Sequence, residues 1–423
     1  MQQDRGDGTI AARISETPVT RSAIGVSPVF DRTRLDGTAR EVYASLKNVE
    51  AWVESHNYMA YEPFDGLSSP LHRFTQRHLF LDRLLLQAIR QSPINLRPFL
   101  GVTPLPSTKG RGYMAAGYIT MYEVTKDATY RARAIGNLDW LIAHKSEGYS
   151  DYAWANHFPF ASRGGTYSAH EPIIVWTALI GFAFVDAFEA FGDSRFLEVA
   201  RSICRWILAL PRERTSSGTC LSYHNLYQES IHNANMLGAA MLARTWKHSG
   251  DSEYLDTATE AMRYSCSRQR SDGSWWYAEE DKYHWVDNFH TGYNLDCLKQ
   301  YIESTGDRTY HDAMLNGLDF YKRHFFRDDG CPRYYYNRTQ PIDSQCAAQS
   351  IETLARFSDL DPSALPLAER VALWTIRNMQ SRDGHFFYRV YPLVKARTAM
   401  LHWAQATTYR ALTLLLRCQQ DRH

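Results

Sequence analysis

The stretch SGDSEYLDTATEAMRYSCSRQRSDGSWWY, residues 249–277, contains two sequence signatures that recur along the chain. The first is Gly-Asp-x-x-aromatic, in which glycine can end one helix and aspartate can cap the next. The second is a glycine, here Gly273, followed by aromatic residues, a pattern typical of short extended segments. The amphipathic pattern between them predicts a helix. One such unit predicts only a helical hairpin, so its repetition decides the fold.

Both signatures repeat with a period of about 55 residues. The first occurs at Gly192, Gly250 and Gly306, with a degenerate copy at Asp127. The second occurs at Gly218, Gly273, Gly330 and Gly384. The helical patterns around these positions predict hairpins at 111–124 and 128–144, 173–191 and 195–210, 233–249 and 253–268, 289–304 and 309–325, and 343–357 and 363–380.

Two more predicted helices, near 38–55 and 398–417, have no partner next to them in the sequence. Pairing them closes a ring of six hairpins. The first helix of each pair is apolar on nearly every side and the second is amphipathic, so the first helices should form the inner ring. We therefore predict an all-α fold, an (α/α)6 toroid or barrel with short β-like segments in the loops at one face. Residues 36–423 would form this single domain, after a disordered or loosely packed tail at 1–35.

Composition excludes several classes of function. The net charge of +1 and the absence of a basic stripe argue against nucleic acid as a partner. The longest apolar run is too short to span a bilayer, so no membrane insertion is expected. The start of the chain lacks the apolar core of a signal peptide, and seven cysteines form no CxxC pair, which favours a cytoplasmic protein with reduced thiols. No metal motif, P-loop or GxGxxG occurs, so we predict neither a metal nor another cofactor.

The inner helices of such a ring run parallel, so their N-terminal ends gather at one face. Asn233, Asn288 and Asp343 lie 55 residues apart and are good helix caps. Two positions later, Asn235, His290 and Gln345 are expected to face a central pocket. The loops before the inner helices supply the other candidates: Trp154, His157, Arg163, His170, Glu171, Tyr223, His232, Trp276, Asp287, Tyr293, Arg397, His402 and Trp403. Each of them also has a structural interpretation, as a cap, a buried hydrogen-bonding group or a packing aromatic residue.

The phrases IHNANMLGAAMLAR (231–244), DGSWWYAEEDKYHWVDNFHTGYNLDCL (272–298), PIDSQCAAQSIETL (341–354), DGHFFYRV (383–390) and HWAQATTYRAL (402–412) resemble an α/α-toroid family encoded in bacterial polysaccharide-biosynthesis clusters. The resemblance covers roughly residues 110–417. Proteins of related fold include glycoside hydrolases, polysaccharide lyases, uronyl epimerases and sugar 2-epimerases, besides terpenoid cyclases and prenyltransferase subunits. The resemblance therefore implies glycan chemistry without choosing the reaction. This chain departs from the family pattern in its last loop, which Arg389, Lys395 and Arg397 make basic, as would suit a carboxylate.

We therefore expect an enzyme acting on a polysaccharide or oligosaccharide that contains uronic acid. A lyase or C5-epimerase needs a base for the α-proton, for which His290, His232, Tyr223 and Tyr293 are candidates beside Asp287. Such an enzyme also needs groups that stabilise the resulting anion, for which the candidates are Arg163, Arg397, Asn235 and Gln345. A glycoside hydrolase would instead use two carboxylates from among Asp287, Asp343, Glu171 and Glu280.

Two alternatives involve neither reaction. The protein could be a non-catalytic glycan-binding or assembly component of the biosynthetic machinery. It could also be terpenoid-cyclase-like, which predicts an apolar aromatic cavity instead of a polar one. Whatever the function, we expect a homodimer or association with polysaccharide-assembly machinery.

Overall fold

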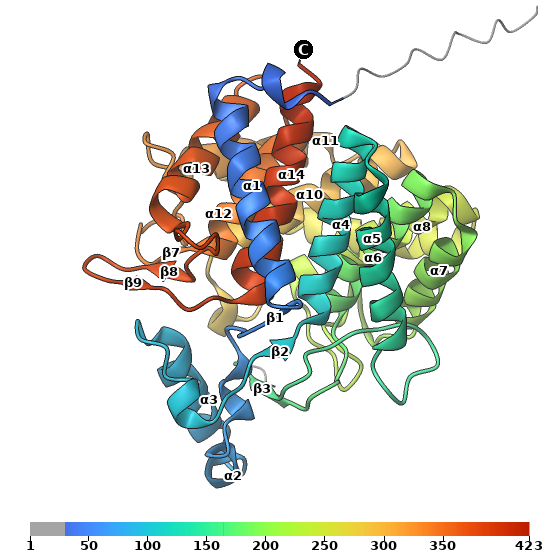
Figure 1. Cartoon of the computed structure of the whole chain (residues 1–423). Coiled ribbons are helices and arrows are strands. Elements are labelled where there is room, and N and C mark those ends of the chain that lie inside the picture. The colour runs from blue at the N-terminus through green and yellow to red at the C-terminus, as the bar shows by residue number, and fades with distance from the viewer. Residues whose placement is uncertain (1–29, 164, 423) are drawn as a thin grey trace, which may run out of the picture.

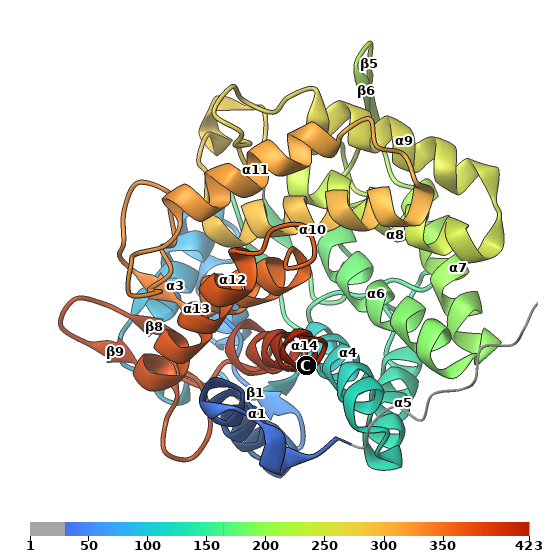
Figure 2. The same cartoon turned by 90° about the horizontal axis from the view of Figure 1, so that it is seen from above.

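A computed structural model of the chain describes residues 30–163 and 165–422. The predicted tail lies outside this part except for residues 30–35, which include the short 3-10 helix η1 (Arg32–Arg34). Within the described residues, the predicted toroid is confirmed, and Figure 2 shows its helices arranged in a double ring. The inner helices are α4 (Thr108–Thr125), α6 (Ile174–Phe191), α8 (His232–Ser249), α10 (Asn288–Thr305), α12 (Ser344–Arg356) and α14 (Thr407–Gln420). The outer helices are α1 (Gly37–Ser55), α5 (Ala128–Ala143), α7 (Ser194–Leu208), α9 (Ser252–Cys266), α11 (His311–His324) and α13 (Ala364–Met379).

The ring closes as predicted, because α14 packs against both α12 and α4, and α1 packs on the outside of α14. The large hydrophobic core includes residues from Leu35 to Leu416 and lies between the two layers of helices. Helix α6 is long and apolar enough to cross a membrane by length and composition, but most of its residues are buried in the ring. Its hydrophobicity is therefore that of an inner helix packed on all sides.

The four repeated glycines hold the inter-helix loops against the outer layer. Gly218, Gly273, Gly330 and Gly384 have φ angles of +117°, +90°, +87° and +105°. A Cβ atom at each would lie 2.4 to 2.6 Å from a backbone carbonyl oxygen on α9, α11, α13 and α1 respectively. The last of these contacts reaches Asn48 on α1, so α1 takes the place of the outer helix that would follow α13.

We expect Gly273→Ala to lower the free energy of unfolding by at least ~2 kcal/mol, because a side chain there meets both a left-handed backbone and a backbone clash. Gly136→Ala on the exposed side of α5 is the matched control, since a Cβ there meets nothing within 4 Å. It should leave stability unchanged or raise it slightly. Urea unfolding of the two variants checks this, and equal stabilities would contradict the packing role of Gly273.

Short antiparallel strands lie in the loops between outer and inner helices, at the face where the inner helices begin. They are β1 (Met59–Ala60) with β2 (Leu105–Pro106), β3 (Phe160–Ala161) with β4 (Thr166–Tyr167), β5 (Arg212–Thr215) with β6 (Gly218–Leu221), and the three-stranded sheet β7 (Ile342–Asp343), β8 (Arg389–Val390) and β9 (Lys395–Ala396). The 3-10 helix η4 (Asp281–Tyr283) and the π-helix η5 (Leu401–Ala406) lie at the same face, directly before α10 and α14. These elements form the rim of the ring.

An insertion between α1 and α4, residues 65–100, projects from this face (Figure 1). We call it the arm. It consists of η2 (Asp65–Ser68), α2 (His72–Thr75), α3 (Leu79–Gln91) and η3 (Pro98–Leu100). A second small core joins it to the rim through Leu67 and Leu86 on the arm and Phe160 and Tyr167 from β3 and β4. A buried ion pair between Arg97 and Asp65, with an N–O distance of 2.7 Å, fixes its two ends together.

Candidate functional site

A cavity of about 460 Å³ lies between the arm and the N-terminal ends of the inner helices. The arm contributes Arg83, Gln87, Arg90 and Gln91 to its wall. The side chains from the ring that matter below are Lys109, Arg163, Trp176, Tyr223, Glu229, Asn233, Trp285, Asp287, His290, Tyr293 and Trp403. The cavity thus lies where the sequence predicted a pocket, with the arm as an additional wall.

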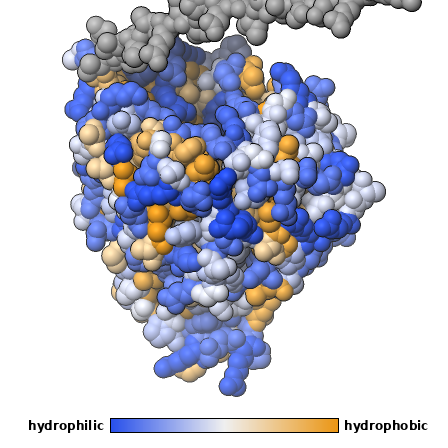
Figure 3. Space-filling model, turned by 90° about the vertical axis from the view of Figure 1, so that its right-hand side faces the viewer, coloured by the Kyte–Doolittle hydropathy of each residue, from blue (hydrophilic) through white to orange (hydrophobic). Residues whose placement is uncertain are grey.

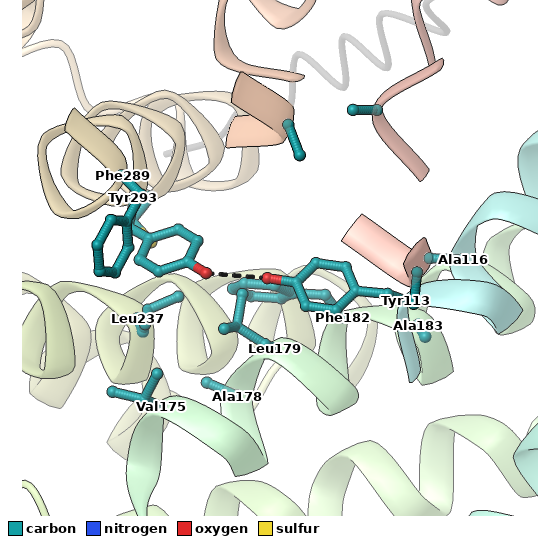
Figure 4. Close-up of a cluster of buried hydrophobic side chains, with 14 of the residues drawn as sticks. Tyr113, Ala116, Val175, Ala178, Leu179, Phe182, Ala183, Leu237, Phe289 and Tyr293 are labelled. Atoms are coloured by element: carbon teal, nitrogen blue, oxygen red, sulfur yellow. Dashed lines mark hydrogen bonds between the residues drawn. The ribbon is translucent and has the colours of Figure 1, made fainter. Parts of the chain in front are cut away.

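Two tyrosines meet at the centre of the ring, and one of them, Tyr293, lines the cavity. Figure 4 shows Tyr113 and Tyr293 pointing toward each other from α4 and α10, and their hydroxyl oxygens are 3.0 Å apart in a hydrogen bond. Gln345 donates to the Tyr293 hydroxyl at 2.9 Å. Burial raises the pKa of both tyrosines, so Tyr293 stays protonated near neutral pH. Burial also raises the pKa of Tyr223. Neither predicted tyrosine base is therefore suited to removing a proton.

A histidine–aspartate pair occupies the wall at the start of α10. Asp287 caps the helix through the backbone N–H of His290, at 3.0 Å. Its other carboxylate oxygen accepts from His290 Nδ1 at 2.7 Å and from Trp285 Nε1 at 3.0 Å. Because Nδ1 donates to a carboxylate, Nε2 of the neutral ring carries the free lone pair. Nε2 makes no hydrogen bond with the described residues, and His290 lines the cavity, so this nitrogen is available as a base.

Lys109, in the first turn of α4, is a site residue that the sequence interpretation missed. The side chain is buried, and its ammonium nitrogen lies 4.7 Å from the ring centroid of Trp176 and 5.8 Å from that of Tyr293. It makes no hydrogen bond or ion pair within the part of the chain described. Burial lowers its pKa to about 7, while the charge of Glu62 acts in the opposite direction. Lys109 can therefore gain and lose a proton near neutral pH.

Glu229 was also missed, and it is the second carboxylate in the cavity wall. Burial alone would raise its pKa, but hydrogen bonding from His224, Tyr283 and Tyr167 lowers it below the ordinary value. The Tyr283 hydroxyl donates at 2.8 Å and the Tyr167 hydroxyl at 3.3 Å. Glu229 is therefore ionised and engaged by protein donors.

Cationic groups outnumber carboxylates in the wall: Arg83, Arg90, Arg163 and Lys109 oppose Glu229 and Asp287. Arg90 lies against the ring of Phe64 at 4.4 Å and donates to the Tyr388 hydroxyl at 3.2 Å, which fixes its direction. The wall thus combines an excess of positive charge with aromatic rings. Such a surface suits a ligand that is both anionic and flat-faced, such as an acidic sugar.

Six of the predicted site residues line the cavity: Tyr223, Asp287, His290, Tyr293, Arg163 and Trp403. Two more lie directly behind it. Asp343 accepts from the indole N–H of Trp403 at 2.7 Å and from Arg389 Nε at 2.5 Å, which positions Trp403 in the wall. Gln345 reaches the cavity only through the hydroxyl of Tyr293.

Four predicted residues serve packing or structural hydrogen bonds instead. Trp154 is fully buried and donates to the Leu141 carbonyl at 2.9 Å. Asn235 accepts from Leu221 N–H and donates to the Ala261 carbonyl. His232 contacts Glu279 at 2.7 Å and Ser265 at 3.2 Å, behind the wall. His402 is buried and paired with Glu62, and burial lowers its pKa.

Five others lie in the rim loops away from the cavity wall. The rings of His157 and His170 stack at 5.0 Å, and burial lowers the pKa of His157 to about 4. Glu171 accepts from the Tyr149 hydroxyl at 2.9 Å. Trp276 stacks on His284 at 4.9 Å, and Arg397 lies 5.5 Å from the ring of Phe387. In each case an aromatic or polar neighbour within the loop accounts for the side chain.

The predicted caps were right only for Asp343, which accepts from the backbone N–H of Gln345. Helix α8 begins after Ile231, and α10 is capped by Asp287, so neither Asn233 nor Asn288 is a cap. Asn288 accepts instead from the hydroxyls of Tyr321 and Ser350. Asn233 lines the cavity, and its side-chain oxygen is buried with no hydrogen-bond partner in the described structure, so it can accept from a ligand hydroxyl.

Among the described residues, no group of three or more His, Cys, Asp or Glu side chains is placed to hold a metal ion. All seven cysteines are free, and five are buried.

No family model matches the sequence, and neither does any curated protein. Solved structures do share the fold. A cellobiose 2-epimerase from Bacillus thermoamylovorans is 12% identical, with a TM-score of 0.58 over 74% of this chain and 88% of the other. An unsaturated glucuronyl hydrolase specific for heparin is also 12% identical, with a TM-score of 0.58 over 91% and 97%. A family 76 glycoside hydrolase from a bovine Bacteroides thetaiotaomicron strain is 11% identical, with a TM-score of 0.60 over 91% and 79%.

Proposed function

From the six-hairpin α/α-toroid fold and its cationic cavity, we propose that the protein is a carbohydrate-active enzyme that transfers a proton at a carbon of an acidic sugar. The observation that carries the proposal is His290, which lines the cavity and is held by Asp287 through Nδ1, so that Nε2 has no protein partner among the described residues. Proteins of the same fold include a sugar epimerase, a D-mannose isomerase and glycoside hydrolases, which supports a sugar ligand.

The substrate class follows from the charge of the cavity wall. The carboxylate of a uronic acid in an oligosaccharide or polysaccharide would meet the arginines of the arm and Lys109. Trp176, Trp285 and Trp403 would face the apolar side of sugar rings, and Asn233 would accept from a hydroxyl. These contacts discriminate an acidic glycan from a neutral one.

In the proposed reaction, His290 Nε2 takes the proton from C5, and the electron pair moves into the carboxyl group. The Lys109 ammonium and the arginines stabilise the charge that develops there. A proton delivered from the Lys109 ammonium to the opposite side of C5 completes an epimerisation, after which His290 loses its proton to water and Lys109 regains one. Alternatively, the pair forms a C4–C5 double bond, the C4–O bond breaks, and the leaving oxygen takes a proton from Lys109. Both routes need a neutral His290 and a protonated Lys109.

Glycoside hydrolysis is the second candidate because two carboxylates, Glu229 and Asp287, line the cavity. A hydrolase needs one carboxylic acid whose pKa is raised so that it can protonate the leaving group. The pKa of Glu229 is lowered, and Asp287 already accepts from three donors. Of the carboxylates predicted for hydrolysis, Asp343, Glu171 and Glu280 do not line the cavity. Proton transfer therefore agrees better with the geometry, and the charged wall disfavours a terpenoid-type substrate.

Incubation with a panel of uronate-containing and neutral glycans tests the proposal. We expect either deuterium at C5 in D2O or the absorbance of an unsaturated uronate, with uronate-containing glycans alone. New reducing ends without either signal would favour hydrolysis. Binding without any change in the glycan would favour the non-catalytic interpretation.

The pH dependence of kcat/KM should show a fall above pH 7, because Lys109, whose pKa is about 7, loses its charge there. The same limb in kcat should lie at higher pH, since a bound carboxylate favours the protonated lysine. In Lys109→Arg the alkaline limb should disappear, because arginine stays charged. An alkaline limb that is unchanged in this variant would show that another group titrates.

A further inference from the structure

Helix α3 of the arm has two sides with different roles. On one side Leu86 and Ile89 are buried, with Leu86 in the small core that attaches the arm to the rim. On the other side Arg83, Gln87 and Arg90 line the cavity. Phe80 and Leu84 continue this second side toward the start of the helix, beyond the cavity wall, and belong to neither the small core nor the cavity lining. Neither the core nor the cavity therefore accounts for a phenylalanine and a leucine at these positions.

Exposed hydrophobic side chains are concentrated on the arm. Seven large hydrophobic residues of the described chain are more than half exposed, and five of them fall between Phe74 and Phe99. Phe80 is 74% exposed and Phe99 is 82% exposed. The side of the ring in Figure 3 carries its hydrophobic residues in small groups among hydrophilic ones. The arm therefore differs from the rest of the surface in the way that a docking site does.

The exposed charged residues of the arm are all positive. Arg73, Arg77 and Arg83 are exposed, whereas the only acidic residue between positions 66 and 122 is Asp82. Asp82 is buried and accepts from the Thr75 hydroxyl at 2.6 Å. A partner for this surface must offer an apolar layer bordered by negative charge, which is the chemistry of an anionic lipid bilayer.

We propose that the arm docks on the surface of an anionic membrane, with Phe80, Leu84 and Phe74 among the acyl chains and the exposed arginines at the phosphates. A symmetric dimer through the same surface would bring the arginines of two copies against each other, which is unfavourable. Docking would place the mouth of the cavity beside the bilayer, because α3 borders both. The inference concerns where the protein acts and does not depend on the reaction proposed above.

Co-sedimentation of the full chain with vesicles tests the proposal. Vesicles of phosphatidylcholine and phosphatidylglycerol, about three to one, should bind the protein at low salt, whereas phosphatidylcholine alone should not. Phe80→Ser with Leu84→Ser, and separately Arg73→Gln with Arg77→Gln, should each weaken binding at least ~10-fold. The control is Leu360→Ser, an exposed leucine at the opposite end of the ring, which should bind like the parent.

Circular dichroism melting must show that the variants are folded, which is expected because the replaced side chains are exposed. Equal binding to both vesicle types, no binding, or full binding by the arm variants would overturn the proposal. Loss of a dimer in Phe80→Ser with Leu84→Ser, without vesicle binding by the parent, would also overturn it and assign the surface to a second copy.

Discussion

Replacing His290 with glutamine should reduce kcat on a uronate-containing glycan by ~10²–10⁴-fold while the affinity for the glycan changes little. The loss is expected because Nε2 of His290 is the proton-accepting atom. No other described imidazole in the cavity wall is bonded to Asp287 and could replace it. Because only a proton-transferring group is removed, kcat should decrease while the affinity of the ground-state complex stays the same. Rates from deuterium incorporation and affinities from titration calorimetry separate the two quantities.

The matched control for His290→Gln is His284→Gln. His284 lies in the loop just before α10 and stacks on Trp276, but it does not line the cavity. It should retain nearly full activity. If both variants lose activity equally, or if His290→Gln keeps more than a tenth of the parent kcat, His290 is not the base.

Replacing Lys109 with methionine should abolish measurable turnover, and it should weaken binding of a uronate glycan more than binding of its neutral counterpart. Lys109 makes no ion pair with a carboxylate among the described residues, and Glu62 acts on its charge only from a distance, so its place in the cavity is explained by an anionic ligand. The same substitution should keep or raise the melting temperature, because methionine fills the space without a buried charge. A loss of activity together with a gain of stability is the signature of a functional residue.

Lys247→Met, in the last turn of α8 at the opposite end of the ring, is the control. It should leave turnover and the preference for uronate unchanged. Equal weakening of acidic and neutral glycans in Lys109→Met would mean that Lys109 shapes the cavity and does not recognise charge.

The fold was predictable because each repeated residue has a physical role that depends on its immediate neighbours. Gly250 and Gly306 end inner helices in the left-handed conformation, and Gly273 and Gly384 allow a loop to contact the next outer helix. Each signal acts within a few residues of its position or on the adjacent hairpin, so it is visible in sequence. Closure was also predictable, since the unpaired first and last helices had only each other as partners.

The site was predictable only where the repeat alignment agreed with the helix starts. Helices α8, α10 and α12 begin at 232, 288 and 344, that is every 56 residues, whereas the aligned polar residues recur every 55. Each copy is therefore shifted by one residue, which turns the side chain by about 100°. His290 consequently faces the cavity while Asn235 faces the outer layer and Gln345 lies behind Tyr293.

One feature of the sequence did indicate that Lys109 is functional, but the alignment of repeats did not use it. A lysine in the first turn of an apolar inner helix opposes the helix dipole, so a structural reason for it is weak. Glu229 gave no comparable signal, because its contacts with the cavity join segments far apart in sequence. The cytoplasmic location, the dimer, the tail at residues 1–35 and the link to polysaccharide biosynthesis stay predictions.

The most direct test of proton transfer by His290 is proton NMR of a uronate oligosaccharide incubated in D2O with the parent enzyme and with His290→Gln. We expect loss of the C5 proton signal, by exchange or by elimination, with the parent and not with the variant. An unchanged C5 proton together with new reducing ends would contradict proton transfer and assign the cavity to hydrolysis.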